Sequence, residues 1–332
     1  MIIHLKKSVD NNKINELAEL YQAIIVNKQD SKILVTGYET KNIQEIHKEY
    51  IDEIFVMDSD IQLANIKYDS NKRQVNINGK IIGGKTNNTI VITGPCSIES
   101  EEQIEQTAKL LIENGLTTLR AGCYKPRTSP YSFQGLGLEG LKLLSKMRDK
   151  YGFSIITEVR DSSHVDDVIN YADIIQIGAK AMYDHAILRK CGKTNKPVLL
   201  KRGFGTTLQE FVQSAEFILS GGNENVILCE RGIRTFESKT RFTLDLCGVA
   251  YLKEYTNLPI ILDPSHAMGY SYGVPDLARA CFAMGIDGLL IESHPNPKFA
   301  KSDSSQQLNH DEFTALFKSL APLAKALEKN II

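Results

Sequence analysis

From Ile90 onward, short apolar runs rich in β-branched residues alternate with longer stretches of helical character. Apolar strands that alternate with helices are typical of a parallel sheet covered on both faces. The strands are expected at residues 90–93, 117–120, 154–158, 173–177, 197–201, 226–230, 259–263 and 288–292. The helices that follow them are expected at residues 100–114, 138–151, 163–171, 182–191, 207–220, 239–255, 275–284 and 310–329. Eight such units predict a (β/α)8 TIM barrel over residues 84–332, because such barrels usually have about 250 residues.

A doubly wound open sheet is the alternative for the same alternation of strands and helices. In its dinucleotide-binding form, a G-x-G-x-x-G turn follows the first strand. No such turn follows residues 90–93, so the barrel is the preferred fold class.

The first 58 residues carry a different pattern, with short elements in the order β-α-β-β-α-β. This order is typical of a small ferredoxin-like α+β unit. Its strands are expected at residues 1–5, 23–27, 32–36 and 54–57, and its helices at 11–21 and 42–50. Further on, Asn78-Gly79 predicts the turn of a hairpin within residues 74–82. The chain is therefore expected to comprise a ferredoxin-like domain (1–60), a linker with the hairpin (61–83) and the barrel (84–332).

The composition limits the possible partners. A formal net charge of −1 gives no global basic field for binding nucleic acid or an anionic membrane. No apolar run approaches the roughly 20 residues of a membrane-spanning helix, and residues 1–8 lack the pattern of a signal peptide. The six cysteines form no C-x-x-C pair, so we expect reduced thiols in a cytoplasmic protein.

Cationic residues follow four of the eight predicted barrel strands. In a (β/α)8 barrel the active site lies at the carboxyl ends of the strands. The cations at or just after these ends are Arg120, Lys125, Arg127, Lys180, Lys201, Arg202, Arg231 and Arg234. If these cations gather at one end of the barrel, they repel one another unless anions lie among them. The planar guanidinium group of arginine matches the geometry of carboxylate and phosphate groups. The pattern favours substrates with several anionic groups, and isolated surface charges are the alternative.

A second set of strand ends carries metal-binding residue types, namely Cys96, His266, Glu292 and Asp303. A thiolate, an imidazole and two carboxylates suit a divalent transition metal. These residues lie far apart in the sequence, so no spacing motif supports the assignment. The alternative is a buried Cys96, a hydrogen-bonded His266 and an Asp303 that caps a helix. His294 is a further candidate ligand.

Lys201 allows a different class of reaction. A lysine at a strand end can form a Schiff base with a carbonyl substrate, and a neighbouring cation such as Arg202 favours the neutral, nucleophilic amine. The residues alone leave this aldolase alternative open.

Six motifs resemble those of one enzyme family. They are GPCS at 94–97, LRAGCYKPRTSPYSFQGLG at 119–137, KRG at 201–203, ERGIRTFE at 230–237, DPSHA at 263–267, and HPNP with SD beyond it at 294–303. These motifs resemble those of the type Iβ 3-deoxy-D-arabino-heptulosonate 7-phosphate (DAHP) synthases, a subgroup with a ferredoxin-like N-terminal domain. The resemblance covers nearly the whole chain.

The resemblance implies that phosphoenolpyruvate condenses with erythrose 4-phosphate and phosphate is released, as the first step of the shikimate pathway of aromatic amino acid biosynthesis. The implied metal ligands are Cys96, His266, Glu292 and Asp303, and the implied ion is divalent (Mn, Fe, Co, Zn or Cu). The implied phosphoenolpyruvate site comprises Arg120, Lys125, Lys201 and Arg231, with Lys180 where a phosphate-binding arginine is expected. The implied erythrose 4-phosphate site comprises Arg127 and Thr128, to which we add Asp263. Lys125 is the expected proton donor, and the expected catalytic set is Lys125, Cys96 and His266.

The resemblance also implies partners. In the resembled subgroup, N-terminal domains of this kind bind tyrosine or phenylalanine as feedback inhibitors, and the enzymes are often tetramers. We therefore expect an aromatic amino acid effector and a homotetramer. A structural or oligomerisation role for residues 1–58 is the alternative.

This chain departs from the family pattern at two places. The family usually reads IGARNxQNF after the fourth strand, where this chain reads IGAKAMYDHA at 177–186. After DPSHA the family usually carries GRR, and here residues 269–271 are GYS. These changes leave anion affinity and aldose preference open. A 3-deoxy-D-manno-octulosonate 8-phosphate synthase and a catalytically inactive phosphoenolpyruvate sensor are the rival functions, although KPRTS at 125–129 favours the four-carbon aldose.

Overall fold

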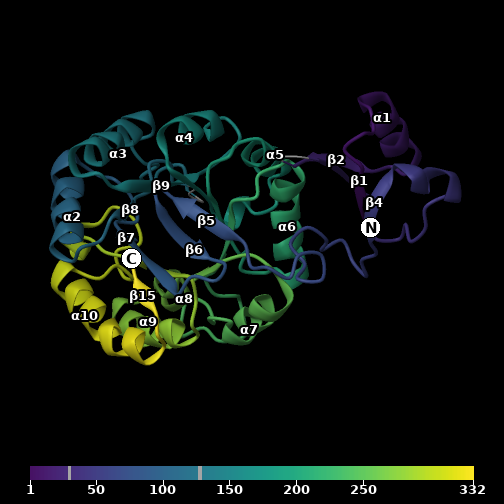
Figure 1. Cartoon of the computed structure of the whole chain (residues 1–332). Coiled ribbons are helices and arrows are strands. Elements are labelled where there is room, and N and C mark those ends of the chain that lie inside the picture. Colours follow the sequence, from purple (N-terminus) through teal and green to yellow (C-terminus); the bar gives the residue numbers. More distant parts are fainter. Residues whose placement is uncertain (29–30, 126–128) are drawn as a thin grey trace.

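The computed structural model describes residues 1–28, 31–125 and 129–332. Over most of this length the chain forms a closed ring of parallel strands inside a ring of helices (Figure 1). The strands are β7 (Asn88–Gly94), β8 (Thr118–Arg120), β9 (Ser154–Val159), β10 (Ile174–Ile177), β11 (Val198–Lys201), β12 (Val226–Glu230), β13 (Ile260–Leu262) and β14 (Gly288–Glu292). Strand β14 pairs with β7 and closes the sheet. The predicted barrel is therefore confirmed, and the open sheet is excluded.

Helices cover the outside of the barrel. They are α2 (Glu101–Glu113), α3 (Leu138–Tyr151), α4 (Val165–Tyr171), α5 (His185–Gly192), α6 (Leu208–Ser220), α7 (Leu246–Tyr255), α9 (Val274–Ala283) and α10 (His310–Ala326). Each helix buries an apolar stripe, and in α2 this stripe includes Ile104, Ala108 and Leu111 at helical spacing. Burial of one large aliphatic side chain contributes roughly 1.5–3 kcal/mol. The side chains of Thr207 and Asn309 begin α6 and α10 with capping boxes.

Two barrel helices begin later than predicted. Helix α7 starts at Leu246 rather than at residue 239, because Thr243 exchanges two backbone hydrogen bonds of 2.9 Å with Ile233 and holds this segment extended. Helix α5 starts at His185 rather than at residue 182, because the side chain of Asp184 caps its first turn.

Among the described α-helices and strands, two short ones were not predicted. Helix α8 (Pro264–Met268) directly follows β13, with Asp263 at its N-cap and Gly269 at its C-cap in a left-handed conformation (φ 76°). Strand β15 (Asn330–Ile331) pairs with the start of β7. Both are too short to give a periodic apolar pattern, so the sequence gives little sign of them.

A hairpin closes the amino-terminal end of the barrel, as predicted from Asn78-Gly79. Strands β5 (Gln74–Ile77) and β6 (Lys80–Gly83) are joined by this turn, in which both residues have positive φ (48° and 90°). Val75, Ile77 and Ile82 pack against the apolar side chains that fill the barrel interior.

The N-terminal unit is an antiparallel sheet with the strand order β2-β3-β1-β4, which is that of a ferredoxin-like fold. Its elements are β1 (Ile2–Leu5), α1 (Asn11–Leu20), β2 (Ile24–Asn27), β3 (Lys32–Val35), η1 (Glu45–Tyr50) and β4 (Ile51–Phe55). The prediction of a second α-helix at 42–50 was wrong, because η1 is a 3-10 helix. The hydroxyl of Tyr21 accepts a hydrogen bond from the amide of Gln44, whose backbone is extended, and β4 follows directly. Six residues remain between these two points, which is less than two turns of an α-helix.

The N-terminal sheet lies beside α5 and α6 of the barrel (Figure 1). Glu216 on α6 anchors the segment that joins the two parts. Its carboxylate accepts hydrogen bonds from the amides of Gln62 (2.8 Å), Leu63 (3.1 Å) and Ala64 (2.8 Å). In the part of the chain that the structure describes, no helix has the length and apolarity to cross a membrane.

Candidate active site

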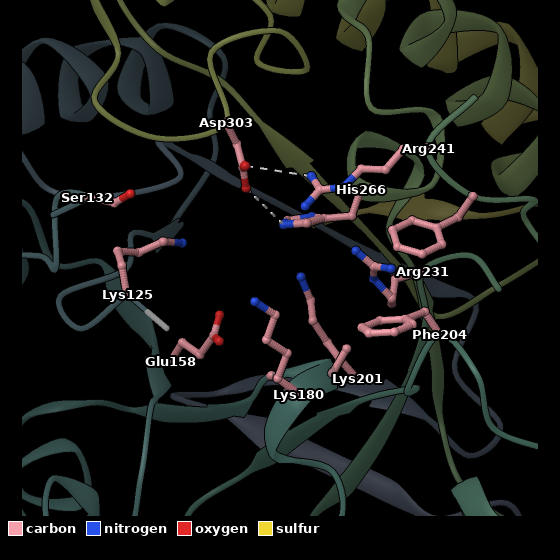
Figure 2. Close-up of a pocket in the computed structure, with 13 residues that line it drawn as sticks. Lys125, Ser132, Glu158, Lys180, Lys201, Phe204, Arg231, Arg241, His266 and Asp303 are labelled. Atoms are coloured by element: carbon pink, nitrogen blue, oxygen red, sulfur yellow. Dashed lines mark ion pairs between the residues drawn. The ribbon is translucent and has the colours of Figure 1, made fainter. Parts of the chain in front are cut away.

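A cavity of about 300 Å³ lies at the carboxyl ends of the barrel strands (Figure 2). Its position agrees with the general location of active sites in this fold. The lining residues are Lys125, Ser132, Glu158, Gly178, Ala179, Lys180, Lys201, Phe204, Arg231, Arg241, Phe242, His266 and Asp303. Six residues of the sequence-predicted site are among them, and most of the others lie just beneath.

The four predicted metal ligands come together at one side of this cavity; we call them the donor cluster (Cys96, His266, Glu292 and Asp303). Cys96 Sγ lies 3.4 Å from Asp303 Oδ2. His266 Nε2 lies 3.6 Å from Glu292 Oε1 and 4.0 Å from Asp303 Oδ2. One ligand atom each from Cys96, Glu292 and Asp303 lie within 4.8 Å of one another. Residues up to 207 positions apart thus form one compact mixed-donor set, of the kind that suits a divalent transition metal.

Of the alternative roles, the geometry excludes that of Asp303 as a helix cap, whereas Cys96 is buried and His266 Nδ1 lies 2.7 Å from Asp263 Oδ2. Asn309, rather than Asp303, caps the following helix. His294 points elsewhere: its Nδ1 accepts a hydrogen bond from the amide of Asn296, and its Nε2 lies 3.7 Å from Glu99. His294 is therefore not part of the donor cluster.

Neighbouring side chains hold Glu292 in place. Arg120 on β8 donates to Glu292 Oε1 at 2.5 Å and to the carbonyl of Pro95 at 3.0 Å. Gln306 donates to the other carboxylate oxygen at 2.6 Å. Burial opposes ionisation of Glu292, but His266 and Arg120 outweigh it and lower the pKa of this carboxyl. Because Arg120 is only 2% exposed and does not line the cavity, its main contact is with the donor cluster.

Asp263 connects Lys201 to His266. Its Oδ2 lies 2.6 Å from Lys201 Nζ and 2.7 Å from His266 Nδ1, so that Nε2 of the imidazole faces the other donors. Burial opposes ionisation of Asp263, but His266 and Lys201 lower the pKa of its carboxyl well below the usual range. The Lys201 amine is thus engaged by a buried carboxylate. The Schiff-base alternative therefore loses its support.

Lys125 lies between the donor cluster and Glu158 (Figure 2). It is 6% exposed, and its Nζ donates to the carbonyl of Cys96 at 3.1 Å. Burial lowers its pKa, but the acidic groups of Cys96 and Glu158 outweigh this effect and raise the pKa of Lys125 above its ordinary value. Lys125 is therefore a charged ammonium at the edge of the cavity.

Glu158 is a cavity residue that sequence reasoning missed, although it ends the third predicted strand. Gln176 donates to its Oε2 at 2.8 Å. The absence of a side chain at Gly178 leaves room for it, since a Cβ there would lie 2.1 Å from Glu158 Oε1. The carboxylate is thereby held towards Lys125.

The predicted cations separate into three groups. Lys180, Lys201 and Arg231 point into the same cavity (Figure 2). Arg202 points away from it, because its guanidinium pairs with Glu230 (3.0 Å) and Asp245 (2.8 Å). The predicted erythrose 4-phosphate residues Arg127 and Thr128 lie outside the described residues.

Arg231 is the buried cation best placed to bind an anion. It is 4% exposed, and within the described residues its Nη1 has no hydrogen-bond partner and no carboxylate oxygen lies within 4.0 Å of it. A buried charge without a partner is unfavourable, so this geometry suits a site that an anionic ligand completes.

Arg241, Phe204, Phe242 and Ser132 also line the cavity without having been predicted. Residues 241 and 242 fall where a helix was expected, and the extended segment instead turns them towards the cavity. Ser132 lies within the motif at 119–137, whereas none of the quoted motifs includes the other three residues.

Comparisons with known proteins agree with this geometry. A model of the DAHP synthetase I family matches residues 65–329. A phospho-2-dehydro-3-deoxyheptonate aldolase of Thermotoga maritima is 49% identical over 237 residues, which are 71% of this chain and 70% of that protein. A 2-dehydro-3-deoxyphosphooctonate aldolase of Bordetella petrii is 34% identical over 267 residues, which are 72% of this chain and 92% of that protein. The solved structure of the Thermotoga maritima DAHP synthase aligns with a TM-score of 0.81 at 38% identity, over 100% of this chain and 99% of that one.

Proposed function

Because this chain belongs to the DAHP synthetase I family, we propose that it condenses phosphoenolpyruvate with erythrose 4-phosphate and water to give DAHP and phosphate. One observation carries the proposal: the donor cluster and five cations lie at a single cavity at the mouth of the barrel (Figure 2). Phosphoenolpyruvate brings a carboxylate and a phosphate, and the aldose brings a second phosphate. Three anionic groups match this density of positive charge.

The donor cluster fits a divalent transition ion such as Mn, Fe, Co or Zn, which Cys96, His266, Glu292 and Asp303 would hold. Such an ion, when bound, polarises a carbonyl oxygen as a Lewis acid. Burial and the nearby Glu292 raise the pKa of the Cys96 thiol to about 12, so the thiol proton has to leave when a metal binds.

Lys125 is the proposed proton donor. In the first step, C3 of phosphoenolpyruvate attacks the aldehyde carbon of the aldose, and Lys125 donates a proton to the aldehyde oxygen as it becomes a hydroxyl. Water then adds at C2, which the attack leaves electron-deficient, and gives a hemiketal phosphate. As the C2 hydroxyl becomes the ketone, the C2–O bond to phosphate breaks, and the departing phosphate takes the hydroxyl proton. Glu158 faces the same space and supplies a carboxylate that can take a proton from this water. Holding both substrates in attack geometry contributes a large part of the rate.

The positions of the cations indicate which residues bind the anionic groups of the substrates. We propose that Arg231, Lys180 and Lys201 hold phosphoenolpyruvate together with Lys125. Asp263 is completely buried between Lys201 and His266, so we propose that it acts on the substrates through these two residues.

Phosphate release provides the test. Purified protein is incubated with phosphoenolpyruvate and either erythrose 4-phosphate or arabinose 5-phosphate, with excess EDTA or with added Mn²⁺. We expect release with the four-carbon aldose, its loss in EDTA and its recovery with Mn²⁺. Release with arabinose 5-phosphate alone would assign the octulosonate reaction instead. Binding of phosphoenolpyruvate without release from either pair would indicate a sensor.

We also propose that residues 1–60 form a regulatory domain that binds tyrosine or phenylalanine, in a homotetramer. The resemblance to feedback-regulated enzymes and the separation of the small sheet from every cavity residue support this assignment.

A further inference from the structure

Four side chains beside the cavity form a series of stacked pairs, Arg231 on Phe242, Phe242 on Phe204, and Arg234 on Phe204, which we call the stack. The guanidinium carbon of Arg231 lies 4.3 Å from the centre of the Phe242 ring. The Phe242 and Phe204 rings are stacked with their centres 5.4 Å apart and their planes 27° apart. The guanidinium carbon of Arg234 lies 4.9 Å from the centre of the Phe204 ring. We propose that Phe242 is a positioning residue that holds Arg231 towards the cavity and thereby sets the affinity for phosphoenolpyruvate, an inference that rests on the function proposed above.

Arg231 needs such support because nothing else described in the protein holds its guanidinium at the cavity. Burial lowers the pKa of Arg231, and a buried cation without a partner is costly. An aromatic face offsets part of this cost in a desolvated site. Stacking leaves the nitrogen edge of the guanidinium unoccupied, and this edge is the part that binds carboxylate or phosphate.

Two carboxylates would compete for a guanidinium that was not held. Asp263 and Glu230 are the acidic groups that act on Arg231. Each already pairs with another cation, Asp263 with Lys201 and Glu230 with Arg202. If the Phe242 ring were removed, Arg231 would be free to turn towards these acids and away from the substrate.

The Phe242 ring itself is fixed by the backbone and does not depend on a ligand. The amide of Phe242 donates to the carbonyl of Ala267 on α8 at 2.9 Å, and the bonds between Thr243 and Ile233 fix the next residue. Gly232 provides the space: its φ is 95°, and a Cβ at this position would lie 2.7 Å from Phe242 Cβ. The stack is therefore formed before the substrate binds, and preorganisation of this kind increases affinity.

The test compares Phe242→Leu with Phe242→Tyr, which keeps an aromatic face. In Phe242→Leu we expect the KM for phosphoenolpyruvate to rise about 10-fold, which corresponds to about 1.4 kcal/mol. The kcat and the KM for erythrose 4-phosphate should change less than about 2-fold, and Phe242→Tyr should resemble the wild type. Phe317→Leu is the matched control, because Phe317 is also a half-buried ring in a stack, with Phe313 on α10 and away from the cavity. An unchanged KM in Phe242→Leu, or an equal rise in Phe242→Tyr, would overturn the proposal.

A second variant keeps the test valid if Phe242→Leu does not fold. The chain contains no tryptophan, so Phe242→Trp introduces a single fluorophore that also retains the stacking face. Phosphoenolpyruvate should change its emission, with a Kd close to that which calorimetry gives for the wild type. If calorimetry detects binding but the emission does not change, the proposed role of residue 242 beside Arg231 is contradicted. If the wild type binds phosphoenolpyruvate but releases no phosphate, the proposed function fails, and the calorimetric Kd of Phe242→Trp relative to wild type still decides the role of residue 242.

Discussion

At the scale of single residues, most of the charge at the barrel mouth is neutralised within the protein. Arg120 and Lys201 are paired with carboxylates, whereas within the described residues Lys180 and Arg231 have no carboxylate within 4.0 Å. A row of cations at strand ends therefore contains two kinds of residue. Some orient the donor cluster, and a smaller number are available to a substrate.

Cys96→Ala removes one donor from the cluster. We expect a loss of activity of at least about 100-fold and loss of bound metal, since a missing ligand weakens a site of this size strongly. Metal content by mass spectrometry after dialysis and phosphate release are the two measurements. Cys191→Ala is the control, because Cys191 is equally buried but lies in α5. Full metal content in Cys96→Ala would contradict the assignment.

Lys180→Arg replaces an ammonium group with a planar guanidinium, which can bind phosphate through two parallel hydrogen bonds. Lys180 is exposed and lines the cavity, so the longer side chain has room. We expect the KM for phosphoenolpyruvate to fall about 3-fold while kcat stays constant, as measured by initial rates. A large rise in KM would show that the pocket is adapted to lysine.

The residues of the donor cluster could be predicted because the ends of consecutive parallel strands meet at one edge of the barrel. Cys96, His266 and Glu292 needed only correct strand assignments. Phe242 could not be predicted in the same way. Its position depends on backbone bonds to Ala267 and on the space above Gly232, and neither leaves a periodic signal.

At the scale of elements, strands were predicted better than helix starts. Apolar runs of β-branched residues mark strands directly, whereas a polar segment such as 239–245 is compatible with a helix until its long-range partners are known. Tyr21 has a similar effect on residues 42–50, since it fixes Gln44 from outside the segment. Long-range hydrogen bonds therefore account for the helices that were wrong or too long.

The start of α10 gives a prediction about pH. His310 is its first residue, and burial together with nearby His294 lowers the pKa of His310 to about 4. An unfolded histidine titrates near 6.5, so below that pH the unfolded chain binds the extra proton first. The free energy of unfolding should therefore fall by on the order of 2 kcal/mol as the pH falls from about 6.5 to 4, with partial exposure limiting the effect. Above about 6.5 this contribution is constant.

The substitution His310→Asn should reduce this fall in the free energy of unfolding at acid pH. Urea titrations between pH 4 and 7.5 would measure it. His185→Asn is the matched control, because His185 is also the first residue of a helix but is exposed. If the free energy of unfolding falls as much with pH in His310→Asn as in the wild type, other groups cause the acid sensitivity.

At the scale of the whole molecule, the proposed regulatory domain and the barrel meet along α6, and the hairpin belongs structurally to the barrel. Val75, Ile77 and Ile82 fill the amino-terminal end of the barrel interior. The exact limits of the domains therefore matter for any truncation.

A chain of residues 74–332 should remain active and lose inhibition by tyrosine or phenylalanine, which the full-length protein should show. Initial rates with increasing amino acid concentration give the comparison. A chain of residues 84–332 should be unstable, because three lost aliphatic side chains remove about 5 kcal/mol or more, comparable to the stability of a typical domain. If the full-length protein ignores both amino acids, residues 1–60 have a structural role.

The pairing of β7 with β14 also determines at what stage of protein synthesis the active site can form. Cys96 and Asp303 are 207 positions apart, and ribosomes add about 5–20 residues per second, so roughly 10–40 s separate the appearance of these two residues. Throughout this interval β7 lacks its last neighbour in the ring, and an unpaired strand edge can pair with other chains. The nascent protein is therefore exposed to aggregation until its final quarter has emerged, and only then can the cluster that includes Cys96 assemble.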